Sequence, residues 1–426
     1  MKKRQLLIIL GAIVVVAAGY FGYNYTQDYL LAQGYAQSDE LAAEVDPELI
    51  TANTGFALNL FDELCSDSPE SNLFISPLSI STALTMAYSG SDGTTEEAMR
   101  TTLEYGDMPT EEIEEGYENL LTSLASVDNN VQLNIANSVW VKQDFDEVVY
   151  ETYKETLETH YKSEYYARPF NQATVDELND WVNEKTEGKI DKILDQIDSQ
   201  NVMFLLNAIY FKADWTNKFE KSDTQKRYFY LTDGTIVQVD TMAQKEDFKY
   251  VNRTNYAACR LPYGREQVAM YIFLPDRDVV LDDWMETLDA ETLDEAINGM
   301  HKVSDLKLRM PKFKFEYGKK RLNNVLSDMG MGVAFEPFEA NLSKIADVSP
   351  QNLYIDFVDH KALIEVDEEG TVAAAATNIG ISLTSAAPSE TRFYVDRPFF
   401  FIIRDDRTGT ILFMGRITNP LEETGK

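Results

Sequence analysis

Side chains that could act as nucleophiles, metal ligands or proton carriers are sparse in this chain. It has three histidines, His160, His301 and His360, and two cysteines, Cys65 and Cys259. None of them stands in an HExxH or CxxC motif, and the chain has no P-loop and no GxSxG turn. We therefore expect no metal and no cofactor. A serine hydrolase that uses His360 stays open as a remote alternative, because the members of a Ser-His-Asp triad need not be adjacent in sequence.

A different chemical feature follows residue 369. Three acids, Asp367 to Glu369, end a strand-like run, Gly370 follows, and no charged residue then appears until Glu390. If this stretch were extended, both of its faces would carry small or β-branched neutral side chains, so either face could be buried in a sheet. Left exposed, such a strand is prone to pair with a sheet edge. A flexible linker is the alternative that its composition leaves open.

The surroundings of this stretch resemble the hinge of the serpins, the family of suicide protease inhibitors. The resemblance rests on HKALIEVDEEGT at residues 360–371. Three more motifs resemble serpin motifs and follow in family order: NLFISPLSI at 72–80, NAIYFKADW at 207–215, and DRPFFFII at 396–403 with LFMGR at 412–416. The chain is thus identified as an inhibitory, prokaryote-like member, with a serpin domain over residues 51–421 and a C-terminal tail over 422–426.

Periodicity indicates the elements that must position these motifs. Apolar residues at helical spacing predict a helix over Phe56 to Cys65, and Ser76-Pro77 predicts a helix start. Met203 to Phe211 is a nearly continuous apolar run, typical of a strand buried on both faces. The alternating pattern shifts phase beyond Pro311, which predicts a bulge or a change of sheet. Helices precede most strands, which indicates an α+β fold. The resemblance implies three β-sheets, about nine helices and an exposed reactive-centre loop.

The resemblance also implies the function, irreversible inhibition of serine proteases. The protease's own serine attacks the loop, and the cleaved loop inserts into the main sheet and traps the acyl-enzyme. Family spacing places the cleaved bond between Thr384 and Ser385, with the register open from Leu383 to Ala387, in a loop at about residues 370–391. By the same resemblance the hinge comprises Glu369, Gly370, Thr371, Val372, Ala373, Ala374, Ala375, Ala376 and Thr377.

The loop's composition predicts the class of target. No Arg or Lys occurs in the loop before Arg392, so a trypsin-like pocket has nothing to bind. We expect elastase-like or subtilisin-like serine proteases as targets, with papain-like cysteine proteases as further candidates. The alternative function is a non-inhibitory serpin acting as a binding or chaperone protein. The hinge departs from the family pattern mainly at Val372, where many members have glutamate, but that side chain would face outward.

Four residues are assigned by resemblance to the shutter, the cluster beneath the place where the main sheet opens: Ser76, Ser79, Asn207 and His360. Asn207 stands alone in an apolar strand, so it must be hydrogen-bonded or cost about 1–3 kcal/mol. For His360 we expect a buried, hydrogen-bonded core position. Trp215 matches the breach, where the loop first enters the sheet, although an ordinary core tryptophan is an alternative there.

Charge limits the partners. The chain has 71 acidic and 38 basic residues, a net charge of −33, which argues against nucleic acid. The acidic run Glu111 to Glu115 would repel heparin-like polyanions. We expect a monomer. Cys65 and Cys259 are expected as buried free thiols, although a disulfide between them stays open.

The N-terminus predicts contact with a membrane. Lys2, Lys3 and Arg4 precede an uncharged run that lasts until Asp28. Because basic residues stay on the cytoplasmic side, we expect an uncleaved anchor over residues 1–26, which would cross the membrane through residues 6–25. A polar tether over 27–50 would follow it and hold the body at the extracellular face. A cleaved signal peptide with secretion is the alternative.

Overall fold

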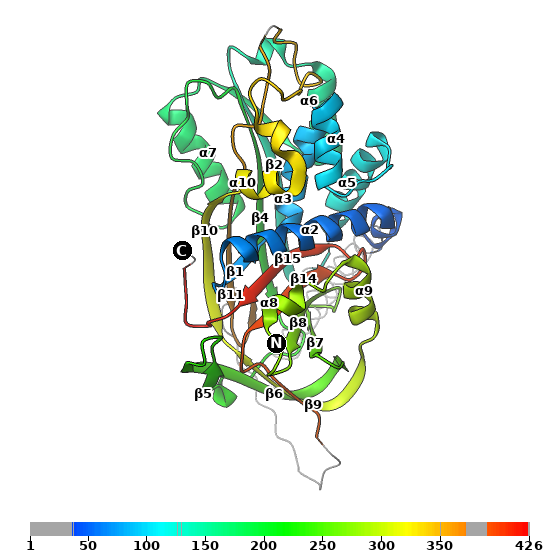
Figure 1. Cartoon of the computed structure of the whole chain (residues 1–426), viewed down its shortest axis with the longest axis vertical. Coiled ribbons are helices and arrows are strands. Elements are labelled where there is room, and N and C mark those ends of the chain that lie inside the picture. Colours follow the sequence, from blue (N-terminus) through cyan, green and yellow to red (C-terminus); the bar gives the residue numbers. More distant parts are fainter. Residues whose placement is uncertain are drawn as a thin grey trace, which may run out of the picture.

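The structure is a computed structural model of the 426-residue chain. It describes residues 36, 38–125, 127–128, 130–349, 351–371 and 390–424. Helices and antiparallel strands combine in one elongated body (Figure 1), which confirms the α+β class. The helices are α2 (Pro47–Asp67), α3 (Pro77–Ser89), α4 (Gly93–Thr102), α5 (Thr110–Leu124), α6 (Glu151–Tyr161), α7 (Gln172–Lys185), α8 (Leu281–Met285), α9 (Ala290–Asn298) and α10 (Asn323–Leu326).

A six-stranded sheet positions the candidate site. Its neighbouring strands are antiparallel except for β2 and β3. Figure 1 shows α7 on one side of this sheet's upper half and α4 to α6 on the other side. In spatial order the strands are β10 (Phe313–Arg321), β11 (Asp359–Val366), β12 (Gly370–Thr371), β4 (Met203–Asp214), β2 (Val131–Lys142) and β3 (Glu164–Arg168).

The remaining strands form one nine-stranded sheet rather than two separate ones. The cause is the long strand β6, which pairs with β5 at 236–241, with β9 at 241–250 and with β7 at 249–252. The resemblance implied three sheets. Here β6 joins two of them by continuous strand pairing, so the described strands form a nine-stranded and a six-stranded sheet. The order is β1 (Leu73–Ile75), β15 (Ile411–Ile417), β14 (Phe399–Asp405), β8 (Val268–Pro275), β7 (Tyr256–Tyr263), β6 (Ile236–Asn252), β9 (His301–Pro311) and β13 (Arg392–Tyr394), with β5 (Gln225–Tyr230) on β6.

Two local predictions from the sequence are confirmed. Ser76 caps α3, since its hydroxyl accepts a hydrogen bond from the Ser79 backbone, and Pro77 occupies the first helical position. The phase shift at Pro311 is a change of sheet, because β9 ends there in the nine-stranded sheet and β10 begins at Phe313 in the six-stranded one. The helix expected from Phe56 starts earlier, at Pro47, because Asp46 caps it.

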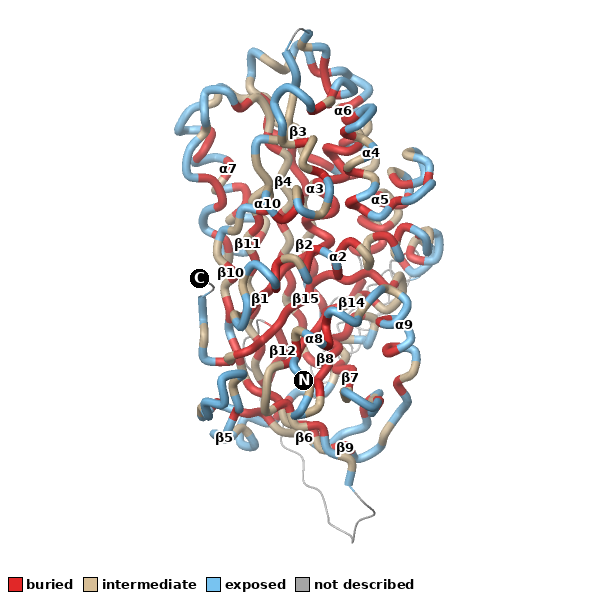
Figure 2. The backbone as a smooth tube through the Cα atoms, in the orientation of Figure 1, coloured by how far each residue is buried: buried red, intermediate tan, exposed pale blue. Residues whose placement is uncertain are grey.

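Buried residues concentrate where α2 and α3 pack on β1, β14 and β15, in the middle of the molecule (Figure 2). Phe74 stacks between Phe401 and Phe413, with ring centroids 6.0 and 5.4 Å away. A second, smaller core lies under α7, where Leu178 and Val182 pack with Trp140 of β2. Cys65 and Cys259 are both buried free thiols, and burial raises the pKa of Cys65 to about 12.

The membrane localisation predicted from the sequence is not supported and is withdrawn. No helix in the described part of the chain is long and apolar enough to cross a bilayer. The expected anchor over residues 1–26, with its crossing segment at 6–25, lies outside the described residues. The predicted position at the extracellular face, as an anchored or secreted protein, depended on that segment and is therefore corrected.

Packing against the body begins before residue 51. Ser38 donates a hydrogen bond to the Ser123 carbonyl over 2.7 Å, and it accepts one from Arg407 over 2.7 Å. Ala42 and Val45 are buried. This segment was expected to be a tether, and its described residues are 36 and 38–50. Contacts with α5 and with the turn that joins β14 to β15 fix part of it against the body.

Candidate functional site

The candidate site is an opening between strands β4 and β11 of the six-stranded sheet. Strand β12 lies between β4 and β11 but contributes only Gly370 and Thr371. Thr371 pairs with Ala213 on one side and with Val366 on the other. Beyond this point the facing edges of β4 and β11 have no strand partner among the described residues. Among the described residues, a central strand therefore begins between β4 and β11 and comprises Gly370 and Thr371.

Gly370 occurs where a side chain would not fit. A Cβ atom at this position would clash with the carbonyl oxygen of Ala213 and lie 2.8 Å from the Cα atom of Asp214. The turn that leads into β12 is held by Asp367, whose carboxylate accepts hydrogen bonds from the backbone of Glu369 (2.9 Å) and Gly370 (3.3 Å). The glycine predicted as the hinge is thus required by the close approach of β4.

Aromatic side chains close the end of the opening at which β12 enters. The Thr371 side chain is 2% exposed, and its hydroxyl lies 2.7 Å from the hydroxyl of Tyr263. Tyr263 stacks on Trp215 with ring centroids 4.4 Å apart. The Trp215 indole donates to the Asp367 carbonyl over 2.9 Å, and its backbone donates to the Glu369 carbonyl over 2.9 Å. Trp215 is therefore in direct contact with the residues that lead into β12.

Two buried carboxylates at the start of the hinge, Glu368 and Glu369, form ion pairs with lysines. Glu368 accepts from Lys312 over 2.7 Å and from Thr224 over 2.7 Å. Burial opposes its ionisation, but these hydrogen bonds outweigh that cost and lower its pKa. Glu369 lies 2.9 Å from Lys221 and 3.1 Å from Lys218. The hydrogen bond from Lys221 is the main cause of its lowered pKa.

Five partners of the hinge were not predicted from the sequence. They are Thr224, Tyr263 and the three lysines Lys218, Lys221 and Lys312. One signal could have found some of them: four lysines recur between residues 212 and 226 of a strongly acidic chain. The spacing alone does not show which acids they meet, because the contacts join residues that are far apart in the sequence.

Three of the four predicted shutter residues are in contact. The Ser76 backbone donates to Nε2 of His360 over 3.3 Å, and the Ser76 hydroxyl donates to the Leu412 carbonyl over 2.7 Å. Burial lowers the pKa of His360 to about 4, so its ring is neutral near pH 7. Since Nε2 accepts a hydrogen bond, the proton of the neutral ring lies on Nδ1. The Ser76 hydroxyl is not directed at His360, which is unlike a nucleophile and its base.

Asn207 has a different partner from the other three. Its side-chain amide donates to the Asn137 carbonyl oxygen over 2.6 Å, and Asn137 in turn donates to the backbone carbonyl of Tyr161 over 2.6 Å. The Asn207 side-chain oxygen is buried and accepts no hydrogen bond from the described residues. Asn137 was not predicted, and it is one of two asparagines in the mostly apolar segment LNIANSVWV of its strand.

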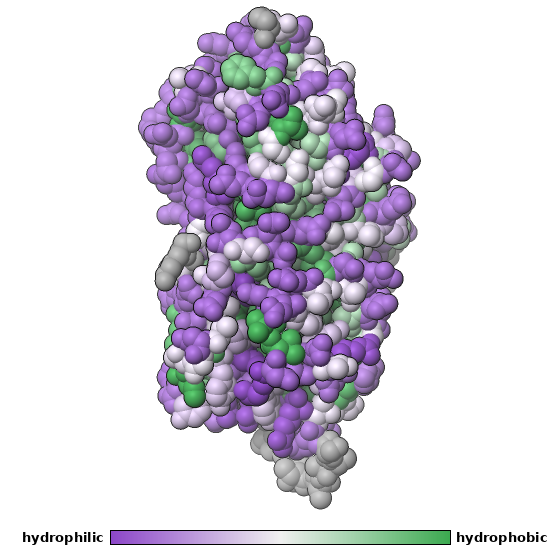
Figure 3. Space-filling view, in the orientation of Figure 1, coloured by the Kyte–Doolittle hydropathy of each residue, from purple (hydrophilic) through white to green (hydrophobic). Residues whose placement is uncertain are grey.

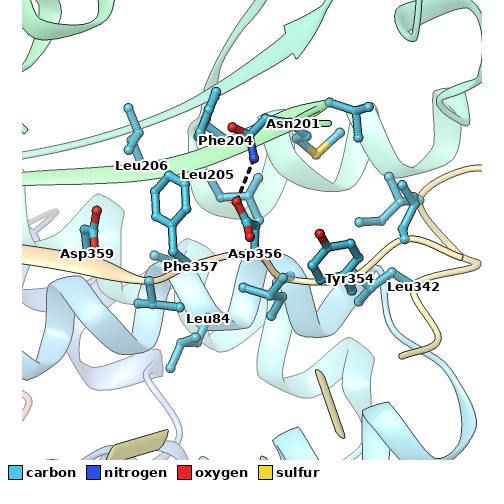
Figure 4. A pocket seen from close by; sticks show the side chains of 18 of the residues that line it. Leu84, Asn201, Phe204, Leu205, Leu206, Leu342, Tyr354, Asp356, Phe357 and Asp359 are labelled. Carbon is cyan, nitrogen blue, oxygen red and sulfur yellow. Dashed lines mark hydrogen bonds between the residues drawn. The ribbon is translucent and has the colours of Figure 1, made fainter. Parts of the chain in front are cut away.

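A cavity of about 920 Å³ extends from the unpaired edge of β4 towards α3 and α7. Most of its lining is apolar, and Figure 4 shows Leu84, Leu205 and Phe357 around it, with a 2.8 Å hydrogen bond from Asn201 to Asp356 at one side. Ser79, Asn207 and His360 also line it. This cavity explains why five of the nine side chains from Met203 to Phe211 are only partly buried, where the sequence predicted burial on both faces.

The predicted reactive bond is not among these observations. It lies outside the described residues, as do all of its alternative positions, from Leu383 to Ala387, which include Thr384 and Ser385. The hinge residues from Val372 to Thr377 also lie outside them. The described chain stops at Thr371 and resumes at Glu390.

Comparisons with known proteins agree with this geometry. Residues 51–420 match the family model described as serpin (serine protease inhibitor). A serpin-like protein of Thermococcus kodakarensis, TK1782, is 35% identical over 394 residues, which are 90% of this chain and 88% of that protein. Serpin B9 of Homo sapiens is 32% identical over 380 residues, 87% of this chain and 99% of that protein.

Two solved structures extend the comparison to the fold. The native state of tengpin, a thermophilic serpin, superposes with a TM-score of 0.80 at 30% identity, covering 88% of this chain and 95% of tengpin. Human thyroxine-binding globulin in complex with its hormone superposes with a TM-score of 0.77 at 27% identity, covering 88% of this chain and 99% of that one.

Proposed function

The chain belongs to the serpin family, and on that basis we propose that it is an irreversible suicide inhibitor of serine proteases. One observation supports this most directly. Strand β12 has begun to form between β4 and β11, and the edges beyond it have no partner among the described residues. A sheet in this state can accept a longer central strand. The chain then acts as a protease substrate whose product does not leave.

The proposed reaction uses the catalytic groups of the protease. Its serine attacks the carbonyl of Thr384, the Thr384–Ser385 bond breaks, and Ser385 leaves with a free amino group. An ester now joins Thr384 to the enzyme. The freed hinge, Gly370 to Thr377, extends β12 and carries the enzyme along before water hydrolyses the ester. The displacement distorts the protease active site and makes the ester permanent.

The register of β12 supports this insertion. Thr371 is paired with Ala213, so each further residue would move one position back along β4. Thr377 would then lie opposite Asn207 and on the same face. A threonine hydroxyl there could donate to the Asn207 oxygen that now lacks a partner. The proposed shutter would hold the sheet closed until the new strand arrives. It consists of Ser76, Ser79, Asn207 and His360.

Loop composition sets the proposed target class. No basic residue occurs between Thr371 and Glu390, and the candidate positions from Thr384 to Ala387 are all small. Elastase-like and subtilisin-like enzymes accept such residues, whereas the trypsin pocket requires a cation. Papain-like cysteine proteases also form acyl-enzymes and are secondary candidates.

A binding or chaperone role without inhibition is the second candidate. It is favoured by the cavity of about 920 Å³ and its mostly apolar lining, which is within the size range of ligand sites. It is also favoured by the likeness to a serpin solved in complex with thyroxine. Against it stands the hinge, which offers no bulky or charged side chain from Gly370 to Thr377.

One experiment separates the two candidates. The full chain is incubated with elastase, subtilisin, papain and trypsin, and the mixtures are separated in SDS. We expect an SDS-stable complex with elastase or subtilisin, little with trypsin, and a released C-terminal peptide that begins at Ser385 or within the window from Leu383 to Ala387. Cleavage in the loop without any covalent complex would contradict inhibition, and a fast stoichiometric trypsin complex would contradict the predicted specificity.

A further inference from the structure

Three of the large hydrophobic side chains that are exposed in the described residues share one face of the β5–β6 hairpin. Tyr228, Tyr230 and Ile236 are 60%, 37% and 55% exposed. The register pairs Tyr230 with Ile236 and Tyr228 with Gln238. Directly paired residues share a face of an antiparallel ladder, and so do residues two apart on one strand. These four residues therefore form one continuous surface, which we call the hairpin patch.

The outward orientation of the hairpin patch is fixed by the opposite face. Phe229 and Val239 alternate with the patch residues and are 0% and 2% exposed, in the main core. Turning the patch inward would expose both of them, at a cost of several kcal/mol. Among the described strands β5 pairs only with β6. Figure 3 shows a small hydrophobic area at the place of this hairpin, one of several on this face.

The hairpin is connected to both sides of the reactive loop. Just before β5, Thr224 donates to Glu368 over 2.7 Å, and Lys221 lies 2.9 Å from Glu369, so this end is fixed to the hinge. At the other end the Tyr230 backbone donates to the Asp396 carbonyl over 2.9 Å, just beyond β13. Figure 1 places β5 with β6 and β9 at the lower pole of the molecule. The chain between Thr371 and Glu390 therefore starts and ends beside the hairpin.

We propose that the hairpin patch is a second contact surface for the target protease, used while the loop occupies the enzyme's cleft. The proposal rests on the proposed inhibitory function. The reactive loop starts and ends at the lower pole of this chain. A protease that binds the loop in its active-site cleft must therefore place the protease surface next to that cleft close to the same pole. Tyrosine suits such a contact, because it supplies a large, stiff area with a polar tip. The contact would discriminate among proteases that all accept the small loop residues.

The charged residues next to the hairpin patch indicate which kind of protease surface it could bind. The Arg277 guanidinium lies 4.8 Å from the centre of the Tyr230 ring and pairs with Asp396, and its side chain is 57% exposed. Lys226 and Asp240 pair over 3.3 Å on the same face of the hairpin. Both charge pairs are internally compensated, so the patch selects by shape and apolar contact more than by net charge. The complementary protease surface is an apolar group flanked by hydrogen-bond acceptors for the tyrosine hydroxyls and Arg277.

The test compares rates of covalent complex formation. Tyr228→Ser with Ile236→Ser, in the full chain, is mixed with subtilisin and with elastase, and the enzyme that wild type traps faster is followed. We expect the second-order rate constant for complex formation to fall about tenfold. The reason is that the variant loses two apolar contacts with the protease, and a tenfold change corresponds to about 1.4 kcal/mol of binding free energy. The number of inhibitor molecules consumed per trapped enzyme and the thermal midpoint should stay unchanged, since loop and core are untouched.

Two controls are matched to this variant. Phe338→Ser removes a side chain that is 92% exposed, in the segment that contacts α4 through a 2.8 Å ion pair between Lys344 and Glu96, and it should leave the rate unchanged. Tyr228→Phe with Ile236→Val keeps most of the apolar contact and should restore most of the rate. If the serine variant has a lowered thermal midpoint, Tyr228→Gln alone replaces it under the same criterion.

The outcomes separate this proposal from the one on which it rests. If wild type traps no enzyme, the inhibitory function is overturned and the hairpin patch with it. If wild type traps enzyme but the serine variant reacts at the same rate, the patch is overturned while inhibition stands. Equal slowing by Phe338→Ser would also overturn it, because the effect would then belong to the surface in general.

Discussion

Thr371 is the residue on which insertion depends most directly. It is already buried in the sheet, where its hydroxyl meets Tyr263. The first prediction is that Thr371→Arg abolishes trapping, because the arginine would have to bury a charge at the head of the new strand. Trapping is a race with deacylation, so a barrier raised by even about 1.4 kcal/mol diverts the outcome tenfold. The measurement is the ratio of cleaved inhibitor to SDS-stable complex.

The structure modifies one part of this prediction. From the sequence alone Thr371 would become buried only after cleavage, and the variant would fold like wild type. Because the side chain is 2% exposed in the uncleaved chain, Thr371→Arg should also lower the thermal midpoint. Thr371→Ser, which keeps the hydroxyl near Tyr263, is the control and should trap enzyme normally. A Thr371→Arg variant that traps as efficiently as wild type would show that the loop does not insert from Gly370.

His360 carries the second prediction, which concerns pH. Burial lowers its pKa from 6.5 to about 4. Between these values the unfolded chain binds a proton that the folded chain does not, so the free energy of unfolding decreases as the pH falls from about 6.5 to about 4. One group with this shift accounts for about 3 kcal/mol over that window. Wild type should lose that much more stability than His360→Gln, measured by denaturant unfolding at each pH.

A flat difference between wild type and His360→Gln across this range would contradict the buried, neutral histidine. The comparison is needed because acidic groups titrate in the same range. Glu368 and Glu369 have lowered pKa values, so their contribution is present above the unfolded pKa of about 4.5 and is lost as the pH falls through their folded values. They are common to both proteins and cancel in the difference.

At the residue scale the sequence could group residues that share a motif, but it could not name partners that lie outside the motifs, and the roles assigned to the grouped residues stay predictions. Ser76, Ser79 and His360 were grouped by resemblance, and the structure brings them together. Asn207 was assigned to the same group by resemblance, and its position in an apolar strand required a hydrogen-bond partner. The structure shows that Asn137 is that partner. An amide in an apolar strand indicates that a hydrogen-bond partner is needed, but it does not indicate which strand supplies the partner.

At the scale of elements, strand β12 is held by lysines on two other segments, the stretch that follows β4 and the link between β9 and β10. Lys312 belongs to the link between β9 and β10, and it reaches Glu368, whose side chain is 6% exposed. The third prediction is that Lys312→Met destabilises the hinge, because a buried carboxylate is left with Thr224 as its main side-chain partner. Breaking such a pair costs about 3–5 kcal/mol when both charges are buried, and less here because Lys312 is partly exposed.

The readout for Lys312→Met is local as well as global. Hydrogen exchange of the Glu369 to Thr371 amides should become faster, and the thermal midpoint should fall. Lys312→Met combined with Glu368→Gln is the matched control, since it removes both charges and should recover much of the loss. If the single variant exchanges like wild type, the ion pair does not hold β12 in place.

Elements could be predicted wherever a local signal was present. Ser76-Pro77 marks the start of α3 because a cap and a first-turn proline act within a few residues. Pro311 marks the change of sheet because the phase of alternation is visible there. The apolar run of β4 predicted burial on both faces, yet many of its side chains are only partly buried. An unfilled place in a sheet leaves no local trace, since the residues beside it must stay apolar to receive the strand.

At the scale of the whole molecule, motif order was enough to identify the family, and the order of elements was enough for the α+β class. The connection between sheets was not predictable, because it depends on one strand, β6, that pairs with three others along its length. The N-terminal anchor was the clear failure. Its prediction used charge and hydropathy alone, and no helix of the described residues is long and apolar enough to cross a bilayer.

The last prediction concerns the stability of the whole molecule after cleavage. The facing edges of β4 and β11 lack strand partners among the described residues, and a cavity of about 920 Å³ lies beside them. An inserted strand would pair both edges and bury apolar surface, each backbone hydrogen bond contributing about 1 kcal/mol. Cutting the loop with a metalloprotease, which forms no acyl-enzyme, should therefore raise the thermal midpoint by at least about 10 °C. Cleaved Thr371→Arg should gain much less. An unchanged midpoint in cleaved wild type would mean that the opening is a fixed feature of the fold, and the cavity would then be better explained as a binding site.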